Sequence, residues 1–174
     1  SEPGNSLTVL DLGKRAVRDT FDLGGYSRPH GIQVSAVGSL LWVTCEGSKA
    51  VLELDARSGA IRNAWTTGQE VSHMVVATPD EKKLYVANIR SGTVTVIERA
   101  GGRVTSVATG EGAEGIDVSP DGREVWVGNR ASNTITILGA ASDTVIASFP
   151  SGGEVSIRVK FTAHGPQTWG SDAR

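Results

Sequence analysis

The chain has 174 residues, of which 39% are hydrophobic and 21% are charged, and its formal net charge is −2. This length and composition are typical of a soluble globular chain that buries a sizeable core. A charge so close to zero argues against a surface for nucleic acid, and no apolar run is long enough to span a membrane. The one cysteine, Cys45, excludes an internal disulfide and is expected to be an ordinary buried or turn thiol.

Four kinds of strand-like segment follow one another from the start of the chain. They read LTVLD from Leu7, AVRDTF from Ala16, GIQVS from Gly31 and LWVTC from Leu41, and they are named here strands C, D, A and B. All are rich in apolar and β-branched residues, and turns of Gly, Ser, Asn or Asp separate them. No stretch shows a sustained helical period with caps, so the chain is predicted to be all-β.

All four segments recur along the chain. Strand A returns from Met74, Gly115 and Arg158, strand B from Leu84, Val125 and Thr168, strand C from Val51, Val94 and Ile135, and strand D from Ala60, Arg103 and Thr144. The aromatic second residues of strand B, Trp42, Tyr85, Trp126 and Trp169, lie 43, 41 and 43 residues apart. Periods of about 40 to 50 residues with four short strands indicate the blades of a β-propeller.

A blade cannot bury both of its faces alone, so blades stack radially and cover each other. The four aromatic residues are predicted to pack between blades rather than to stack on a ligand. The predicted architecture is a half-blade, three blades and a half-blade of four-stranded antiparallel type. As a single propeller domain or part of one, it divides into strands C and D at 1–23, full blades at 30–66, 73–109 and 114–150, and strands A and B at 157–174.

The two ends cut the repeat in the same place, and two explanations compete. The half-blades can pair and close a ring, within one chain as four blades or between two chains as an eight-bladed homodimer. Alternatively, the chain is a piece of a longer protein cut at an exposed loop. Closure is favoured, because an unpaired strand pair leaves a long apolar edge.

At LYVANIRSGTVTVIE from Leu84, GIDVSPDGREVWVGNRASNTITIL from Gly115 and RPHGIQVS from Arg28, the chain closely resembles the YVTN-repeat β-propellers. The resemblance implies a bacterial or archaeal propeller, usually of seven blades, often exported to the periplasm or cell surface, and mostly without an assigned reaction. Similar blades occur in the haem d1 domain of nitrite reductase, in nitrous oxide reductase and in lactonase-type propellers. This chain has material for four blades, and its last repeat lacks the Pro-Asp-Gly turn.

Propeller sites gather at the mouth of the central channel, where the loops that enter strand A converge. The repeat places His30, His73, Glu114 and Ile157 at that position, with Arg158 beside the last. Two histidines and a carboxylate around one axis would suit a divalent metal or would orient an anion. The imidazoles could instead cap turns through hydrogen bonds.

Other polar residues fit structural roles. Glu70 and Glu111 lie in the entering loops, where they enlarge a polar mouth or are solvated charges. Asp80 and Asp121 are predicted to bond their own turn backbone. His164 falls in a turn away from the mouth and is left out of the site.

No catalytic motif is present, so the chain is interpreted as a non-enzymatic propeller that binds a ligand or a protein through loops at the channel mouth. The alternative is a metal-binding or metal-dependent propeller, resembling the lactonases or reductases, with His30, His73 and Glu114 as ligands. No membrane span is expected. The resemblance implies an extracytoplasmic location.

Overall fold

The computed structural model describes residues 4–152, 156–162 and 165–170. All regular structure within these ranges is β-strand, which confirms the all-β prediction. In the same ranges there is no helix of the length and apolarity needed to cross a membrane.

Three complete blades follow one another, and each is a sheet of four consecutive antiparallel strands. Blade I comprises β3 (Pro29–Val34), β4 (Leu40–Cys45), β5 (Ala50–Asp55) and β6 (Ile61–Thr66). Blade II comprises β7 (Ser72–Ala77), β8 (Lys83–Asn88), β9 (Thr93–Glu98) and β10 (Arg103–Ala108). Blade III comprises β11 (Ala113–Val118), β12 (Glu124–Asn129), β13 (Thr134–Gly139) and β14 (Thr144–Pro150).

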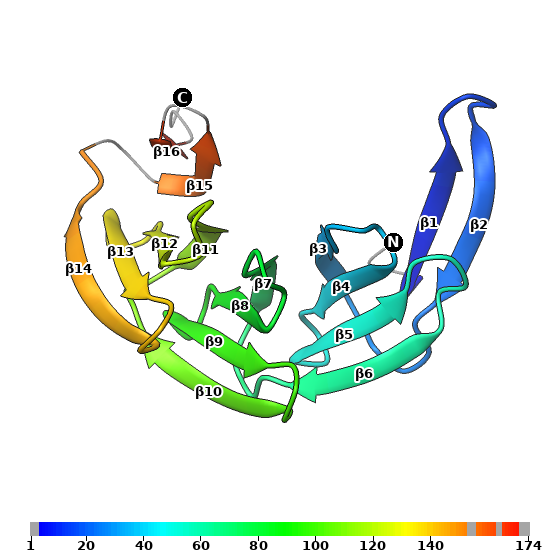
Figure 1. Cartoon of the computed structure of the whole chain (residues 1–174), viewed down its shortest axis with the longest axis horizontal. Helices are drawn as coiled ribbons and strands as arrows, with labels where there is room; N and C mark the ends of the chain where they lie inside the picture. The colour runs from blue at the N-terminus through cyan, green and yellow to red at the C-terminus, as the bar shows by residue number, and fades with distance from the viewer. Residues whose placement is uncertain (1–3, 153–155, 163–164, 171–174) are drawn as a thin grey trace.

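A two-stranded half-blade lies at each end of this series. The first is β1 (Ser6–Asp11) with β2 (Ala16–Asp22), and the last is β15 (Ser156–Thr162) with β16 (Gly165–Gly170). They are separate sheets at opposite ends of an open arc, with β6, β10 and β14 along its convex side (Figure 1). The structure therefore does not show a ring of four blades closed within one chain, because the angle between successive blades leaves the two half-blades apart.

The sequence of each strand reflects its depth in the blade. The middle strands β5 and β9 are buried on both faces, so apolar residues fill most of their positions, as in VLEL and VTVI. The outer strand β10 faces solvent over most of its length and carries polar residues. The order of strand kinds along the chain is the one predicted from the repeat.

The hydrophobic core lies between the blades. Trp42 of blade I belongs to a cluster with Val75 and Leu84 of blade II, and Tyr85 of blade II belongs to a cluster with Ile116 of blade III. Both aromatic side chains are fully buried. The predicted packing role of these aromatic residues is confirmed.

Trp126 takes the corresponding place at the last interface. Its ring stands edge-on to Phe161 of β15, with 5.8 Å between ring centroids. The fourth aromatic residue of the series, Trp169, has a side chain outside the described residues.

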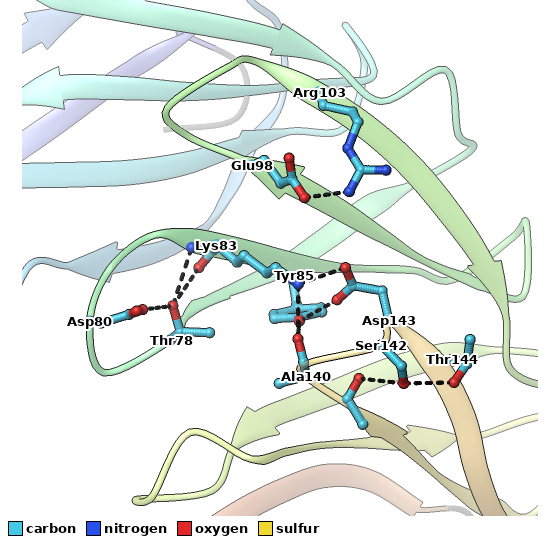
Figure 2. A network of polar contacts seen from close by, with 11 residues as sticks. Thr78, Asp80, Lys83, Tyr85, Glu98, Arg103, Ala140, Ser142, Asp143 and Thr144 are labelled. Atoms are coloured by element: carbon cyan, nitrogen blue, oxygen red, sulfur yellow. Dashed lines mark hydrogen bonds and ion pairs between the residues drawn. The ribbon is translucent and has the colours of Figure 1, made fainter.

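Polar contacts also tie each blade to the next. Between blades II and III, the hydroxyl of Tyr85 donates to Asp143 (2.6 Å), and the ammonium group of Lys83 binds the same carboxylate (2.7 Å), as Figure 2 shows. Between blades I and II, the buried Glu53 accepts hydrogen bonds from Trp42 (2.8 Å) and Arg99 (2.8 Å). Because these carboxylates bind groups from both blades, they fix the angle at which the blades meet.

The turns between strands A and B behave as predicted. Asp80 accepts a hydrogen bond from the backbone of Lys82, and Asp121 accepts one from the backbone of Arg123. Gly122 closes its turn at a φ of 71°, in the left-handed region that favours glycine. These carboxylates are therefore part of the turns, at the end of the blades opposite the entering loops.

The innermost strands β3, β7, β11 and β15 pack side by side. A Cβ atom at Gly31 would lie 2.4 Å from the carbonyl oxygen of His73, and one at Gly115 would lie 2.6 Å from the Cα of Arg158. Both obstacles are backbone atoms, which cannot turn away. Glycine is therefore required at these two positions for the inner strands to approach each other.

Gly31→Ala should lower the free energy of unfolding by about 1 to 3 kcal/mol, because the added methyl group forces β3 away from β7. Urea unfolding followed by circular dichroism measures this change. Gly25→Ala is the matched control, since a Cβ there meets nothing within 4 Å. Equal stability of the two variants would contradict the close approach of the inner strands.

Burial raises the pKa of Tyr85 above its ordinary value, and the hydrogen bond to Asp143 raises it further by a smaller amount. An unfolded tyrosine ionises near pH ~10, so this contribution to stability is present below that pH and is lost as the pH rises above it. Tyr85→Phe should therefore remove part of the alkaline loss of stability, up to about 1.4 kcal/mol per pH unit. Urea unfolding from pH 8 to pH ~11 tests this. Parallel profiles for wild type and Tyr85→Phe would contradict the prediction.

Candidate functional site at the channel mouth

A β-bulge occurs at the same repeat position in every inner strand. In β7, Ser72 pairs with Asn88 and Met74 pairs with Ala87, so His73 is an extra residue with no partner in β8. In the same way Glu114 is the extra residue of β11, Ile157 that of β15, and His30 lies within the register shift of β3. A bulge re-aims the side chain that it carries, and this one recurs in all four repeats.

The bulge also corrects the predicted strand boundaries. Strand A was expected to start at Gly31, Met74, Gly115 and Arg158, but each inner strand starts two residues earlier. The candidate residues therefore lie within strands and not in the loops before them. Pairing on both sides of the bulge holds their backbone more firmly than a loop would.

A left-handed residue precedes the bulges of β3, β7 and β11 by two positions. Arg28, Val71 and Gly112 have φ values of 55°, 57° and 73°. Left-handed φ suits glycine, but for a β-branched residue such as Val71 it is a true outlier. Strained backbone of this kind is kept where the surrounding structure holds a functional geometry.

The bulges bring the two histidines together. The rings of His30 and His73 stack with 3.8 Å between centroids and 29° between planes. Thr44 helps to hold them, because its hydroxyl group donates to the carbonyl oxygen of His73 (2.6 Å) and accepts from the amide of Gly31 (2.7 Å). One buried side chain thus links the bulges of blades I and II.

Both ring nitrogens of His73 face carboxylates. Nδ1 lies 2.6 Å from Oε1 of Glu46, and Nε2 lies 3.9 Å from Oε1 of Glu114. The predicted residues His30, His73 and Glu114 therefore do lie close together at the mouth, with His73 next to both of the others. Their role as metal ligands stays a prediction.

Glu46 is the member of this cluster that the sequence did not suggest. It follows the last residue of β4, and its side chain is only 4% exposed. The position of Glu46 follows from the antiparallel pairing of strands A and B. In such a pair the end of strand B lies beside the start of strand A, as the pairing of Cys45 with Pro29 shows. The turns after strand B therefore contribute to the same site as the residues at the start of strand A.

Two arginines complete the charge arrangement. Arg28 lies 3.1 Å from Oε2 of Glu46, and Arg130 lies 3.1 Å from Oε2 of Glu114. Arg130 holds the repeat position that Glu46 holds in blade I. Each of the two carboxylates beside His73 is thus paired with an arginine on its other side.

The other predicted residues lie around the cluster. Arg158 follows the bulge of β15 and is exposed, and within the described part of the chain it takes no part in the ion pairs of the cluster. The side chain of Ile157 and all of His164 lie outside the described residues. Glu70 forms an ion pair with Lys49, and this hydrogen bond and charge lower the pKa of Glu70 below its ordinary value.

A hollow of about 760 Å³ opens beside the cluster, between the entering loops and the turns after strand B of blades II and III. Arg28, Arg90 and Arg130 line it together with Glu111. Its volume is in the range of ligand sites. Three guanidinium groups against one carboxylate make it predominantly cationic.

Cys45 ends β4 beneath this face. Its side chain is fully buried, and burial raises the pKa of its thiol to about 11. A thiol of this kind stays protonated at neutral pH and is a poor nucleophile. The interpretation of Cys45 as an ordinary buried thiol agrees with this environment.

Comparison with known proteins is consistent with the fold. The chain is similar to hydrazine synthase of Kuenenia stuttgartiensis, with a TM-score of 0.74, 24% identity, and coverage of 79% of this chain and 40% of that chain. It is also similar to the β-propeller domain of Cps50 (Swd1) from Myceliophteria thermophila, with a TM-score of 0.79, 12% identity, and coverage of 96% and 58%. At these identities the likeness shows the fold alone, and the chain spans about half the length of these structures.

No curated protein sequence matches the chain. The model of one family, described as the YNCE-like β-propeller, matches residues 23–167. This match confirms the resemblance to propellers of the YVTN type that the repeats indicated. The chain belongs to the YNCE-like β-propeller family.

Proposed function

We propose that the chain is a non-enzymatic binding propeller that takes an anionic ligand at its channel mouth. The β-propeller fold supports a binding or scaffolding role in general. The observation that carries the finer proposal is the hollow lined by Arg28, Arg90 and Arg130. These residues come from turns and loops of all three blades, so the hollow depends on the assembled arc.

The chemistry of arginine narrows the ligand class. A guanidinium group offers a planar fork of donors that matches carboxylate and phosphate oxygens in pairs. Arg28 and Arg130 are already oriented by Glu46 and Glu114, while Arg90 is exposed. A ligand with carboxylate or phosphate groups, free or on a protein segment, fits this arrangement.

The ion pairs that Arg28 and Arg130 already form also affect how strongly an anion binds. An incoming anion competes with Glu46 for Arg28 and with Glu114 for Arg130, so part of its interaction energy is offset. Arg90 lies in the turn after β8, and in the described part of the chain no ion pair within 4 Å holds it. We expect Arg90 to make the largest single contribution to anion binding.

Titration calorimetry with citrate, inorganic phosphate and a glutamate-rich peptide tests the proposal. At least one of these anions should bind the wild-type chain, and binding should weaken as salt is added. Arg90→Ala and Arg130→Ala should each weaken it about tenfold or more, since a hydrogen bond to a charged group contributes about 1.5 to 3 kcal/mol.

Arg57→Ala is the matched control, because Arg57 lines a different hollow beside Gly38. Its affinity for the anion should equal that of the wild type. Absence of binding for all three anions would contradict the proposal, and so would binding that survives Arg90→Ala and Arg130→Ala unchanged. An extracytoplasmic location and an eight-bladed homodimer stay predictions.

A further inference from the structure

The cluster at the mouth contains a ligand set that differs from the one the sequence suggested. His30, Glu46 and His73 each offer one ligand atom, and these three atoms lie within 4.8 Å of one another. They come from the bulge of β3, the turn after β4 and the bulge of β7. Two imidazoles and one carboxylate form a ligand set that divalent transition metals such as Zn²⁺ prefer.

We propose that His30, Glu46 and His73 bind a divalent transition-metal ion of the Zn²⁺ class. Glu46 replaces Glu114 as the carboxylate ligand, because its Oε1 already lies 2.6 Å from Nδ1 of His73. Ligand atoms of one tetrahedral ion sit about 2.0 to 2.2 Å from it and about 3.4 Å from each other. The two atoms can therefore share an ion once the proton between them leaves and the side chains move slightly apart.

Burial and exposure suit the entry of an ion. The side chains of Glu46 and His73 are 4% and 15% exposed, so their charges act in a medium of low polarity. His30 is exposed, so its ring is free to turn from stacking on His73 to pointing at the ion. The ion therefore enters from the His30 side and keeps an open coordination position there.

The hydrogen-bonding and ion-pair partners of the ligands are placed to orient them toward such an ion. Oε2 of Glu46 binds Arg28, which leaves Oε1 for the metal. With the metal on Nδ1 of His73, the proton of the ring moves to Nε2, which faces Glu114. A carboxylate that accepts from the second nitrogen of a ligating histidine orients the ring and raises its basicity.

Glu114 thereby becomes a positioning residue and not a ligand. Its distance of 3.9 Å from Nε2 is longer than a hydrogen bond, and a small shift of the ring toward it closes the gap. Arg130 holds the other oxygen of Glu114 in place at 3.1 Å. The roles of the two carboxylates can therefore be told apart by experiment.

The inference concerns the same mouth as the proposed function but requires no anion in the hollow. Arg90→Ala should leave the affinity for the metal unchanged, because Arg90 belongs to the hollow and to no contact of the histidine cluster. Loss of anion binding with intact metal binding would overturn only the proposed function. Loss of metal binding with intact anion binding would overturn only this inference.

The test is titration of the EDTA-treated wild-type chain with Zn²⁺, by calorimetry, and with Co²⁺, by visible absorption. One ion should bind per chain, and bound Co²⁺ should show the intense d–d bands of a four-coordinate site. His73→Ala, His30→Ala and Glu46→Gln should each weaken binding by about 100-fold and change the Co²⁺ spectrum. Glu114→Gln should weaken binding about 10-fold and leave the spectrum unchanged.

Two control variants show whether the loss of metal binding is specific to the proposed ligands. Glu98→Gln makes the same change as Glu46→Gln at the opposite end of a blade, where Glu98 pairs with Arg103. His164→Ala removes the remaining histidine of the chain. Both should bind metal like the wild type, and melting curves in EDTA check that every variant is folded.

His30→Ala is the decisive variant, because an exposed side chain can be removed without disturbing the core. The proposal is overturned if the folded wild type shows no saturable binding of Zn²⁺ or Co²⁺. It is equally overturned if binding of one ion survives both His30→Ala and His73→Ala, or if His164→Ala removes it.

Discussion

The close packing of the inner strands is the constraint on which the rest of the structure depends. Gly31 and Gly115 have no side chain because the backbone of the next inner strand occupies the space where a Cβ would lie. This approach sets the curvature of the arc and brings the bulges of neighbouring strands side by side (Figure 1). The contact between His30 and His73 follows from it, since each side chain projects from such a bulge.

The blades carry two kinds of polar structure with different consequences. At the end that holds the A–B turns, Tyr85, Lys83 and Asp143 form a satisfied network that links two blades and leaves no group over for a ligand (Figure 2). At the other end, His73 lies between Glu46 and Glu114, and arginines flank both carboxylates. The second arrangement adjoins the hollow lined by Arg28, Arg90 and Arg130, which is why we place binding there.

Much of the fold could be predicted from the sequence because its signals are local and repeated. The period of strand B, with Trp42, Tyr85 and Trp126, is visible in one chain, and so are the apolar runs of the buried strands. The shared position of His30, His73 and Glu114 was predictable for the same reason. Glu46 was harder to predict, because it follows β4, the partner strand of β3, and its own repeat position holds unlike residues. Bulges and left-handed residues such as Val71 were also missed, since no residue type marks them.

The measurement that tests the central claim most directly is the nuclear Overhauser effect between the imidazole protons of His30 and His73. His30→Ala and His73→Ala assign the signals in a chain with three histidines. Bulges that face each other predict a strong cross-peak between the two rings, in keeping with centroids 3.8 Å apart. Well-resolved ring signals without that cross-peak would mean that the inner strands do not bring the histidines together, and the site described here would not exist.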